Sequence, residues 1–123
     1  MAAESESAVA LAHLRLSVSD ISSAVSFFEA LGAETDIRRD GFAVVELKDR
    51  TRLQFRQSAE PVAPQPDLQF DFKVADIDAA WADYQAKGLN PGEITRRRPG
   101  HDSFMLSGPD SCEVQINSGF NRA

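Results

Sequence analysis

Apolar and polar residues alternate at the start of the patterned part of the chain. Over residues 11–18, Leu14, Leu16 and Val18 point to one side of the chain, whereas His13, Arg15 and Ser17 point to the other. Such alternation is typical of a β-strand with one buried and one exposed face. The pattern therefore predicts a half-buried first strand whose polar face carries these three polar side chains.

A helical pattern follows this strand. Apolar residues recur every three or four positions from Ile21 to Leu31, which is the spacing of one face of an α-helix. Asp20 is a favoured N-cap residue and Gly32 suits the position that ends a helix, so we expect a helix from Asp20 to Leu31. Three short alternating runs then predict strands at residues 33–39, 42–48 and 52–57.

The whole series of patterns occurs a second time. In the second copy, Val74 corresponds to Val18 at the end of the strand, Asp76 to the helix cap Asp20, and Gly88 to the helix-ending Gly32. The position of His13 is taken by Gln69. A second helix is expected from Asp76 to Lys87. Three more strands are expected at about 93–98, 103–107 and 112–117. Internal repetition indicates a chain built from similar units, so the predicted fold class is α+β with two βαβββ modules.

The repeat also defines the predicted domain organisation. The small and polar residues 1–8 are expected to form a disordered tail, and residues 9–118 a single domain. Module one covers 9–57 and module two covers 68–118. The intervening residues 58–67 contain three prolines, which cannot sustain helix or sheet pairing, and are expected to form an extended linker.

Composition limits the partners of the chain. The 13 basic and 19 acidic side chains give a net charge of −6, which disfavours a nucleic acid or an anionic membrane as partner. No apolar run approaches the roughly 20 residues of a membrane-spanning helix. The N-terminus is acidic where a signal peptide would be basic, and Cys112 has no second cysteine to pair with. We therefore expect a cytoplasmic protein.

The chain contains two copies of a strand, a Val-x-Asp-Ile motif and a helix, and a Gly-Pro-Asp-Ser turn at 108–111 precedes the last strand. This combination resembles the vicinal oxygen chelate superfamily. This group includes glyoxalase I, fosfomycin-resistance enzymes, extradiol dioxygenases and bleomycin-resistance proteins. The resemblance covers residues 9–118. It implies that the modules form an incomplete, mixed eight-stranded barrel around a cleft, often with modules shared between two chains. We therefore expect a homodimer.

In metal-using members of the family, the first and fourth strands of each module supply one ligand each. By position, these ligands correspond to His13, Gln54, Gln69 and Gln115. Three amides and one imidazole supply no negative charge, whereas a divalent transition metal is normally bound by imidazole, thiolate or carboxylate. We therefore predict no bound metal. The alternative is one divalent metal ion held by His13 with Glu113 or Gln115, which Glu46 could also reach.

Without a metal, long polar side chains would line the cleft together with His13. These are Arg15, Ser17, Arg52, Gln54, Arg56, Gln69, Asp71, Lys73, Glu113, Gln115 and Asn117. Such a surface suits a hydrated, hydrogen-bonding ligand. A simpler interpretation, which we favour, is that the charged members Arg15, Lys73, Asp71 and Glu113 pair across neighbouring strands. The parity of Phe42 and Val44 allows either an apolar wall at the cleft mouth or ordinary core packing.

Two other features have alternative interpretations. Residues 96–102, Arg-Arg-Arg-Pro-Gly-His-Asp, resemble a segment that covers the cleft in several family members and could clamp an anion. The interpretation we favour is a charged edge strand that resists aggregation. Cys112 shares parity with Val114 and Ile116, which predicts a buried structural thiol.

Three classes of function remain. The first is metal-free binding of a small organic molecule, an antibiotic or a metabolite, in a dimer cleft. The second is a metal-dependent enzyme of the glyoxalase, fosfomycin-resistance or dioxygenase type. The third is an interaction or regulatory dimer with a vestigial cleft. We rank them in this order and assign no catalytic residue, although His13 is the candidate for a general base.

Overall fold

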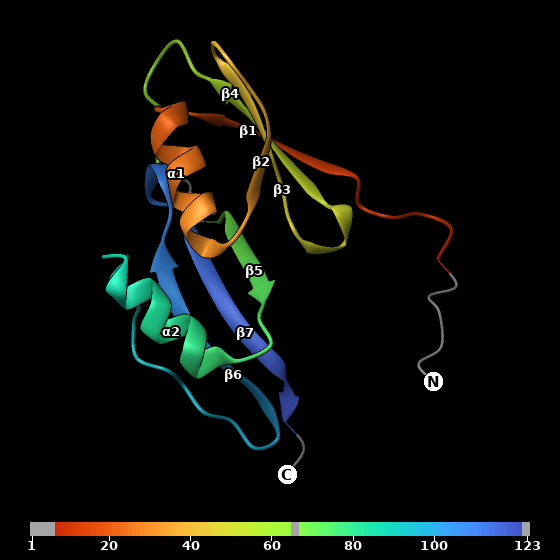
Figure 1. Cartoon of the computed structure of the whole chain (residues 1–123), viewed down its shortest axis with the longest axis vertical. Coiled ribbons are helices and arrows are strands. Elements are labelled where there is room, and N and C mark those ends of the chain that lie inside the picture. Colours follow the sequence, from red (N-terminus) through yellow and green to blue (C-terminus); the bar gives the residue numbers. More distant parts are fainter. Residues whose placement is uncertain (1–6, 65–66, 122–123) are drawn as a thin grey trace.

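Module one is a four-stranded sheet with one helix packed against it (Figure 1). The computed structural model describes residues 7–64 and 67–121. The module contains β1 (His13–Val18), α1 (Ile21–Leu31), β2 (Glu34–Arg39), β3 (Phe42–Glu46) and β4 (Arg52–Gln57), with a short 3₁₀ turn at Lys48–Arg50. The strand order is β1-β4-β3-β2, and only β1 and β4 run parallel. The predicted βαβββ pattern is therefore confirmed for this module.

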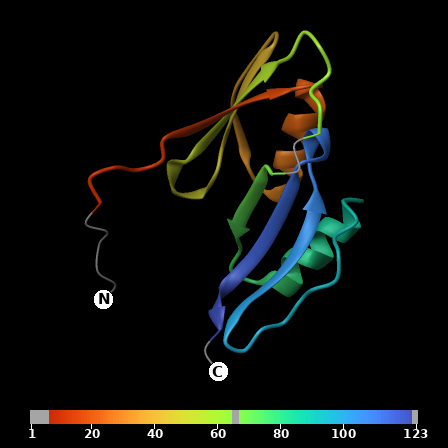
Figure 2. The same cartoon turned by 180° about the vertical axis from the view of Figure 1, so that it is seen from behind.

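Module two repeats this arrangement with one strand fewer. It contains β5 (Gln69–Lys73), α2 (Ile77–Ala86), β6 (Gly100–Ser107), a 3₁₀ turn at Pro109–Ser111 and β7 (Glu113–Asn121). The strand order is β5-β7-β6, with β5 and β7 parallel. Seen from behind, α2 lies beyond β6 and β7, and this helix covers only one face of the sheet (Figure 2). The final strand runs past residue 118, the predicted end of the domain.

The strand predicted at residues 93–98 does not form. A single isolated bridge between Thr95 and Ser103 stands in its place. The backbone N–H of Arg97 donates to the carboxylate of Asp102 at 3.2 Å, and Pro99 has no N–H to donate, so a regular ladder cannot continue. Within the described ranges the chain has seven strands in two separate sheets, and they do not close into a barrel.

The helix boundaries follow the predicted capping chemistry. Asp20 accepts hydrogen bonds from the backbone N–H of Ser22 and Ser23 at 3.0 and 3.3 Å, and Asp76 accepts one from Ala79 at 3.0 Å. Gly32 ends α1 with a φ of 119°, a conformation that a residue with a Cβ rarely adopts. The second helix ends at Ala86, one residue before the predicted end.

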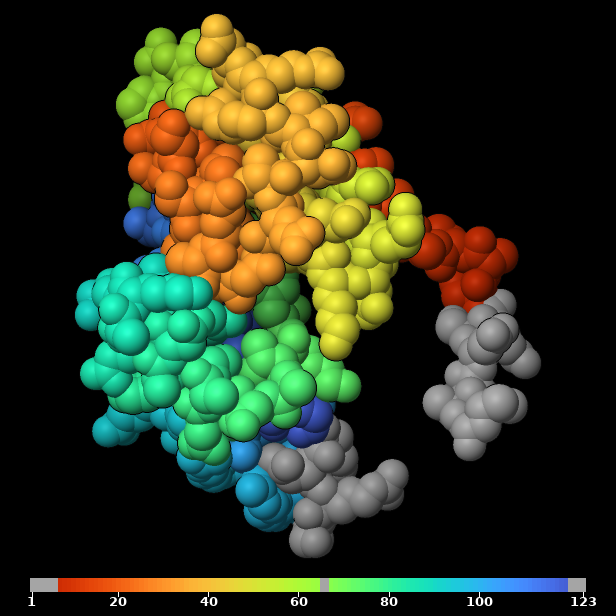
Figure 3. Space-filling model, in the orientation of Figure 1, coloured from red at the N-terminus to blue at the C-terminus, as the bar shows by residue number. Residues whose placement is uncertain are grey.

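One apolar core joins the two modules. Phe28 of α1 is 1% exposed, and its ring centroid lies 5.3 Å from that of Phe55 in its own module. It also lies 5.6 and 6.2 Å from the rings of Phe70 and Phe72 in module two. The hydroxyl of Tyr84 in α2 donates to the carbonyl oxygen of Leu31 at 3.0 Å. Figure 3 shows the resulting contact between the ends of the two helices.

Polar contacts fix the junction at the start of α1. The backbone N–H of Ser19 donates to Asp110 Oδ2 at 3.0 Å, and the hydroxyl of Ser19 accepts from the N–H of Val62 in the linker at 2.7 Å. The described part of the linker has neither helix nor strand, as predicted, whereas residues 65–66 lie outside the described ranges. Of the predicted tail, residues 1–6 also lie outside them.

Residues 7–12 precede β1 as an extended segment that runs away from the body of the protein (Figure 1). Two apolar side chains on it, Val9 and Leu11, are 80% and 65% exposed. No helix in the described part of the chain is long and apolar enough to cross a membrane.

Candidate functional site

Each sheet has one apolar face packed against a helix and one polar face that remains open. Along β1, Val18 is buried and the leucines are half-buried, whereas His13, Arg15 and Ser17 are exposed. The strands β4, β5 and β7 alternate in the same way. The predicted parity is therefore confirmed, and all polar candidate residues lie on the open faces.

The open face of module one is organised in three rows that cross the strands. The first row is His13, Arg52, Glu46 and Glu34. The second row is Arg15, Gln54, Val44 and Ile37. The third row is Ser17, Arg56, Phe42 and Arg39. The carboxylates of these rows are confined to the first, while the other two rows contain arginines that form no ion pair with the described residues.

Arg52 is engaged by carboxylates. Its Nε lies 3.3 Å from Asp36 Oδ2 and its Nη2 lies 3.3 Å from Glu46 Oε2. The Nε contact lacks hydrogen-bond geometry and is therefore an electrostatic contact. Arg52 and Glu46 thus contact each other in this structure, and the ligand or metal role considered for them from the sequence stays a prediction.

A cavity of about 160 Å³ lies over the second and third rows. The side chains that line it from the open face are Arg15, Ser17, Phe42, Gln54 and Arg56. Phe42 therefore contributes the apolar wall that its parity allowed. Val44 is 3% exposed, but it is buried on the open side of the sheet and is not part of the main core cluster.

The open face of module two is linked by hydrogen bonds between its own side chains. Gln69 Nε2 donates to Asp71 Oδ1 at 2.8 Å and to Gln115 Oε1 at 3.4 Å, and Gln115 Nε2 donates to Asn117 Oδ1 at 2.8 Å. Met105 of β6 stands opposite Gln115 and is 37% exposed. The amides of this face are therefore already hydrogen-bonded, and they share it with the charged side chains of Asp71, Lys73 and Glu113.

The favoured cross-strand ion pairing is wrong. Arg15 lies on the sheet of module one, whereas Lys73, Asp71 and Glu113 lie on the sheet of module two. Within the described ranges, none of these four side chains forms an ion pair. The sequence pattern placed all four on polar faces but could not say which strands share a sheet.

The four positions that correspond to metal ligands fall into two equivalent pairs. His13 and Gln54 lie on adjacent strands β1 and β4, and Gln69 and Gln115 lie on adjacent strands β5 and β7. The structure brings the two glutamines of module two into contact, while the other pair lies on the other sheet. The expected hydrogen bond from His13 to a neighbour is not formed among the described residues. Convergence of all four positions remains a prediction.

These donors do not fit a divalent transition metal. The part of the chain that the structure describes holds no group of three or more His, Cys, Asp or Glu side chains arranged to bind a metal ion. Neutral amides from Gln54, Gln69 and Gln115 offer weak donors, and Glu46 is held by Arg52. Among the described candidates, His13 on the sheet of module one and Glu113 on the sheet of module two supply the strong donors, and they lie on separate sheets.

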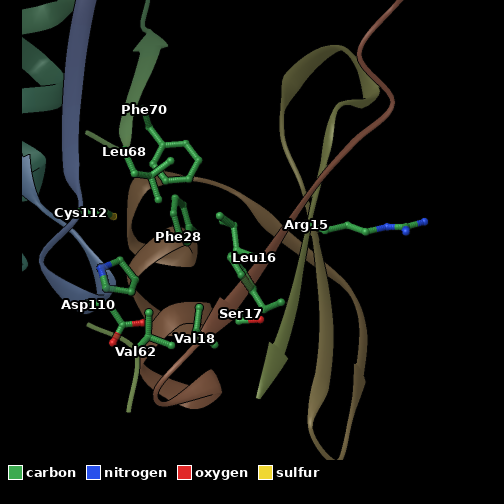
Figure 4. Close-up of a pocket in the computed structure, with 12 residues that line it drawn as sticks. Arg15, Leu16, Ser17, Val18, Phe28, Val62, Leu68, Phe70, Asp110 and Cys112 are labelled. Atoms are coloured by element: carbon green, nitrogen blue, oxygen red, sulfur yellow. The ribbon is translucent and has the colours of Figure 1, made fainter. Parts of the chain in front are cut away.

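A second cavity, of about 230 Å³, lies at the junction of the modules. Figure 4 shows Leu16, Val18, Phe28 and Phe70 around it, while Arg15 points away from it. Its lining comes from β1, α1, β4, the linker, β5 and the turn before β7, so no local sequence signal could have indicated it. Cys112 also lines this cavity. The thiol is buried as predicted, and burial raises its pKa, which disfavours the reactive thiolate.

In the arginine-rich segment, residues 96–99 form an anchored loop, and residues 100–102 begin β6, the edge strand of its sheet. Asp102 is 4% exposed and accepts from Arg98 Nη1 at 2.8 Å and from Arg96 Nη1 at 3.3 Å. Arg96 Nη2 also donates to Asp78 Oδ1 in the first turn of α2 at 2.6 Å. Hydrogen bonding from Arg98 holds the pKa of Asp102 below its usual range. Both arginines are therefore engaged by the protein's own carboxylates.

A model of the Glyoxalase/Bleomycin resistance protein/Dioxygenase superfamily matches residues 10–116. The chain belongs to this superfamily, as the repeated strand-cap-helix pattern and the paired parallel strands of the two modules indicate. A comparison with curated proteins found no match.

Several solved structures share the fold. A protein from the mobile metagenome of V. pseudocholerae has a TM-score of 0.76 and 21% identity, over 96% of this chain and 100% of that chain. The oxidase ChaP-H1 has a TM-score of 0.73 and 25% identity, over 90% and 96%. A lactoylglutathione lyase from Agrobacterium tumefaciens has a TM-score of 0.71 and 18% identity, over 94% and 96%.

Proposed function

We propose that the chain is a small-molecule-binding protein that acts as a homodimer without a tightly held metal. Its binding cleft lies between the open face of module one in one copy and the open face of module two in the other. The observation that carries this proposal is the distribution of polar side chains: both apolar sheet faces are covered by helices, while both polar faces stay open. Two such faces brought together form a polar cleft in which the predicted ligand positions meet.

The alternative is a metal-dependent enzyme of the same superfamily. It is favoured by His13, which occupies the position of a metal ligand, and by the likeness to a lactoylglutathione lyase and an oxidase. The donor chemistry argues against it, because three of the four ligand positions are amides. The superfamily name itself covers both binding proteins and enzymes, so fold alone does not decide between them.

The proposal predicts a C2 dimer in solution. Sedimentation velocity at several protein concentrations should show a species of twice the 13.5 kDa chain mass, because the open faces need a partner to form the cleft. Persistence of a monomer at high micromolar concentration would leave each polar face open and would contradict the shared cleft.

Metal affinity should appear when the missing carboxylates are introduced. In the double variant Gln54→Glu/Gln115→Glu, two charged oxygen donors join His13 at the family's ligand positions, so metal analysis by mass spectrometry after zinc or manganese exposure should show stoichiometric ion. The control Gln85→Glu adds a charge to the exposed side of α2 and should bind none. Stoichiometric zinc, nickel, manganese or iron in the unmodified protein, lost on His13→Ala, would instead support the enzyme.

A further inference from the structure

The internal repeat allows the two open faces to be compared position by position. Arg15 corresponds to Asp71, because Arg15 pairs with Gln54 across β1 and β4 just as Asp71 pairs with Gln115 across β5 and β7. Arg56 corresponds to Asn117, because each lies two residues after that glutamine. In module two, both of these side chains accept hydrogen bonds from the neighbouring glutamines. In module one, within the ranges that the structure describes, neither arginine side chain has a hydrogen bond or an ion pair.

Both arginines line the same cavity. The parallel register places Arg15 opposite Gln54 and Ser17 opposite Arg56, so the two arginines stand diagonally across the strand pair on one face. Phe42 of β3 lies directly opposite Arg56 and closes the third side of the cavity of about 160 Å³. Figure 4 shows that Arg15 points away from the apolar junction of the modules and therefore toward the open face.

Among the residues that the structure describes, no carboxylate lies within ion-pair distance of Arg15 or Arg56. The carboxylates of this face lie at its other end, where Arg52 contacts Asp36 and Glu46. Arg39, opposite Phe42 in the third row, adds further positive charge. The cavity is thus the positive end of a charge-segregated face, although the chain as a whole carries a net charge of −6.

We propose that this cavity is an anion subsite in which Arg15 and Arg56 bind the carboxylate or phosphoryl head group of a small organic ligand. Guanidinium groups match the planar fork of such oxyanions and bind them through charge-assisted hydrogen bonds. Phe42 packs against the apolar part next to the head group. The cavity is smaller than a site for a whole drug-sized molecule, so it holds one end of the ligand. This inference rests on the proposed ligand cleft and specifies the charge of its occupant.

The test uses four aromatic probes that differ in head group. Benzoate, benzamide and benzamidinium have nearly the same shape but carry negative, neutral and positive groups, and phenyl phosphate distinguishes a phosphoryl preference from a carboxylate preference. Each is titrated into ¹⁵N-labelled full-length protein and followed by NMR. Benzoate or phenyl phosphate should cause saturable shifts at residues 15–17, 42 and 54–56, with at least about ten-fold tighter binding than benzamide. Benzamidinium should bind most weakly.

Single variants assign the head-group contacts. Arg15→Gln and Arg56→Gln should each weaken binding of the better anion by about five- to ten-fold while leaving the benzamide affinity unchanged. Lys48→Gln removes an exposed positive charge in the turn between β3 and β4, outside the cavity, and should leave both affinities as they are. Unchanged NMR spectra away from the cavity show that each variant is folded.

The inference is overturned if the three isosteric probes bind equally, if benzamidinium binds best, or if neither anion shifts the residues of the cavity. Equal binding is the result expected if carboxylates of a second copy, such as Asp71 or Glu113, neutralise the arginines in the dimer. These results leave the proposed function intact, because that proposal depends on dimerisation and on metal content, which are measured separately.

Discussion

Phe28→Ala is expected to destabilise the protein by about 3–5 kcal/mol, the cost of removing a fully buried aromatic side chain. The ring is 1% exposed and packs against Phe55 in one module and against Phe70 and Phe72 in the other. Its removal leaves a cavity at the point where the modules share their core. The loss should therefore weaken both modules at once.

Urea denaturation at a fixed protein concentration measures this effect. Circular dichroism reports on both modules, and the fluorescence of Trp81 in α2 reports on module two alone. Both signals should move together to lower urea concentration, although the substitution is in module one. Phe42→Ala is the matched control, because this phenylalanine is half-buried on the open face. A shift seen only by circular dichroism would show that the modules unfold separately.

Asp102→Asn should release the loop formed by residues 96–99. The carboxylate accepts from Arg98, Arg96 and the backbone N–H of Arg97, and an amide cannot replace its charge. Hydrogen–deuterium exchange of these residues should become at least about ten-fold faster, because the contacts that close the loop are weakened. Asp78→Asn removes only the exposed partner of Arg96 and should have a smaller effect. Equal exchange in both variants would contradict an anchor at Asp102.

The same contact makes a pH-dependent contribution. Because the pKa of Asp102 is held below its ordinary value of 3.8, the carboxylate favours the folded state at every pH above that value. This contribution is lost as the pH falls through the lowered pKa. The thermal stability of the native protein and of Asp102→Asn should therefore differ by a constant amount near neutral pH and converge in acid below about pH 3.8. A difference that persists unchanged in acid would exclude the carboxylate as its cause.

Local sequence signals predicted the elements well wherever local chemistry determines them. Asp20 and Asp76 cap their helices as expected, and alternation assigned the buried and exposed faces of the strands correctly. The strand predicted at residues 93–98 was wrong because a side chain only a few residues further on, that of Asp102, accepts the backbone N–H of Arg97. Alternation contains no information about such a side-chain competitor.

The candidate site was predictable by face but not by partner. Parity placed Arg15, Arg56 and Asp71 on open faces, which the structure confirms. Pairing depends on which strands share a sheet and in which register, and neither quantity follows from one strand's pattern. For this reason the segregation of Arg15 and Arg56 from the carboxylates near Arg52 became visible only in the structure. The junction cavity was invisible for the same reason.

The parallel pairing of the first and last strand in each module has a consequence for synthesis on the ribosome. The helix α1 and the β2–β3 hairpin can form from neighbouring residues, but β1 gains its partner only when β4 has emerged. Even then the ring of Phe28 lacks Phe70 and Phe72 until β5 follows. A nascent chain that has completed only module one therefore exposes an aromatic surface at the tunnel exit, where a holding chaperone could shield it until the second half arrives.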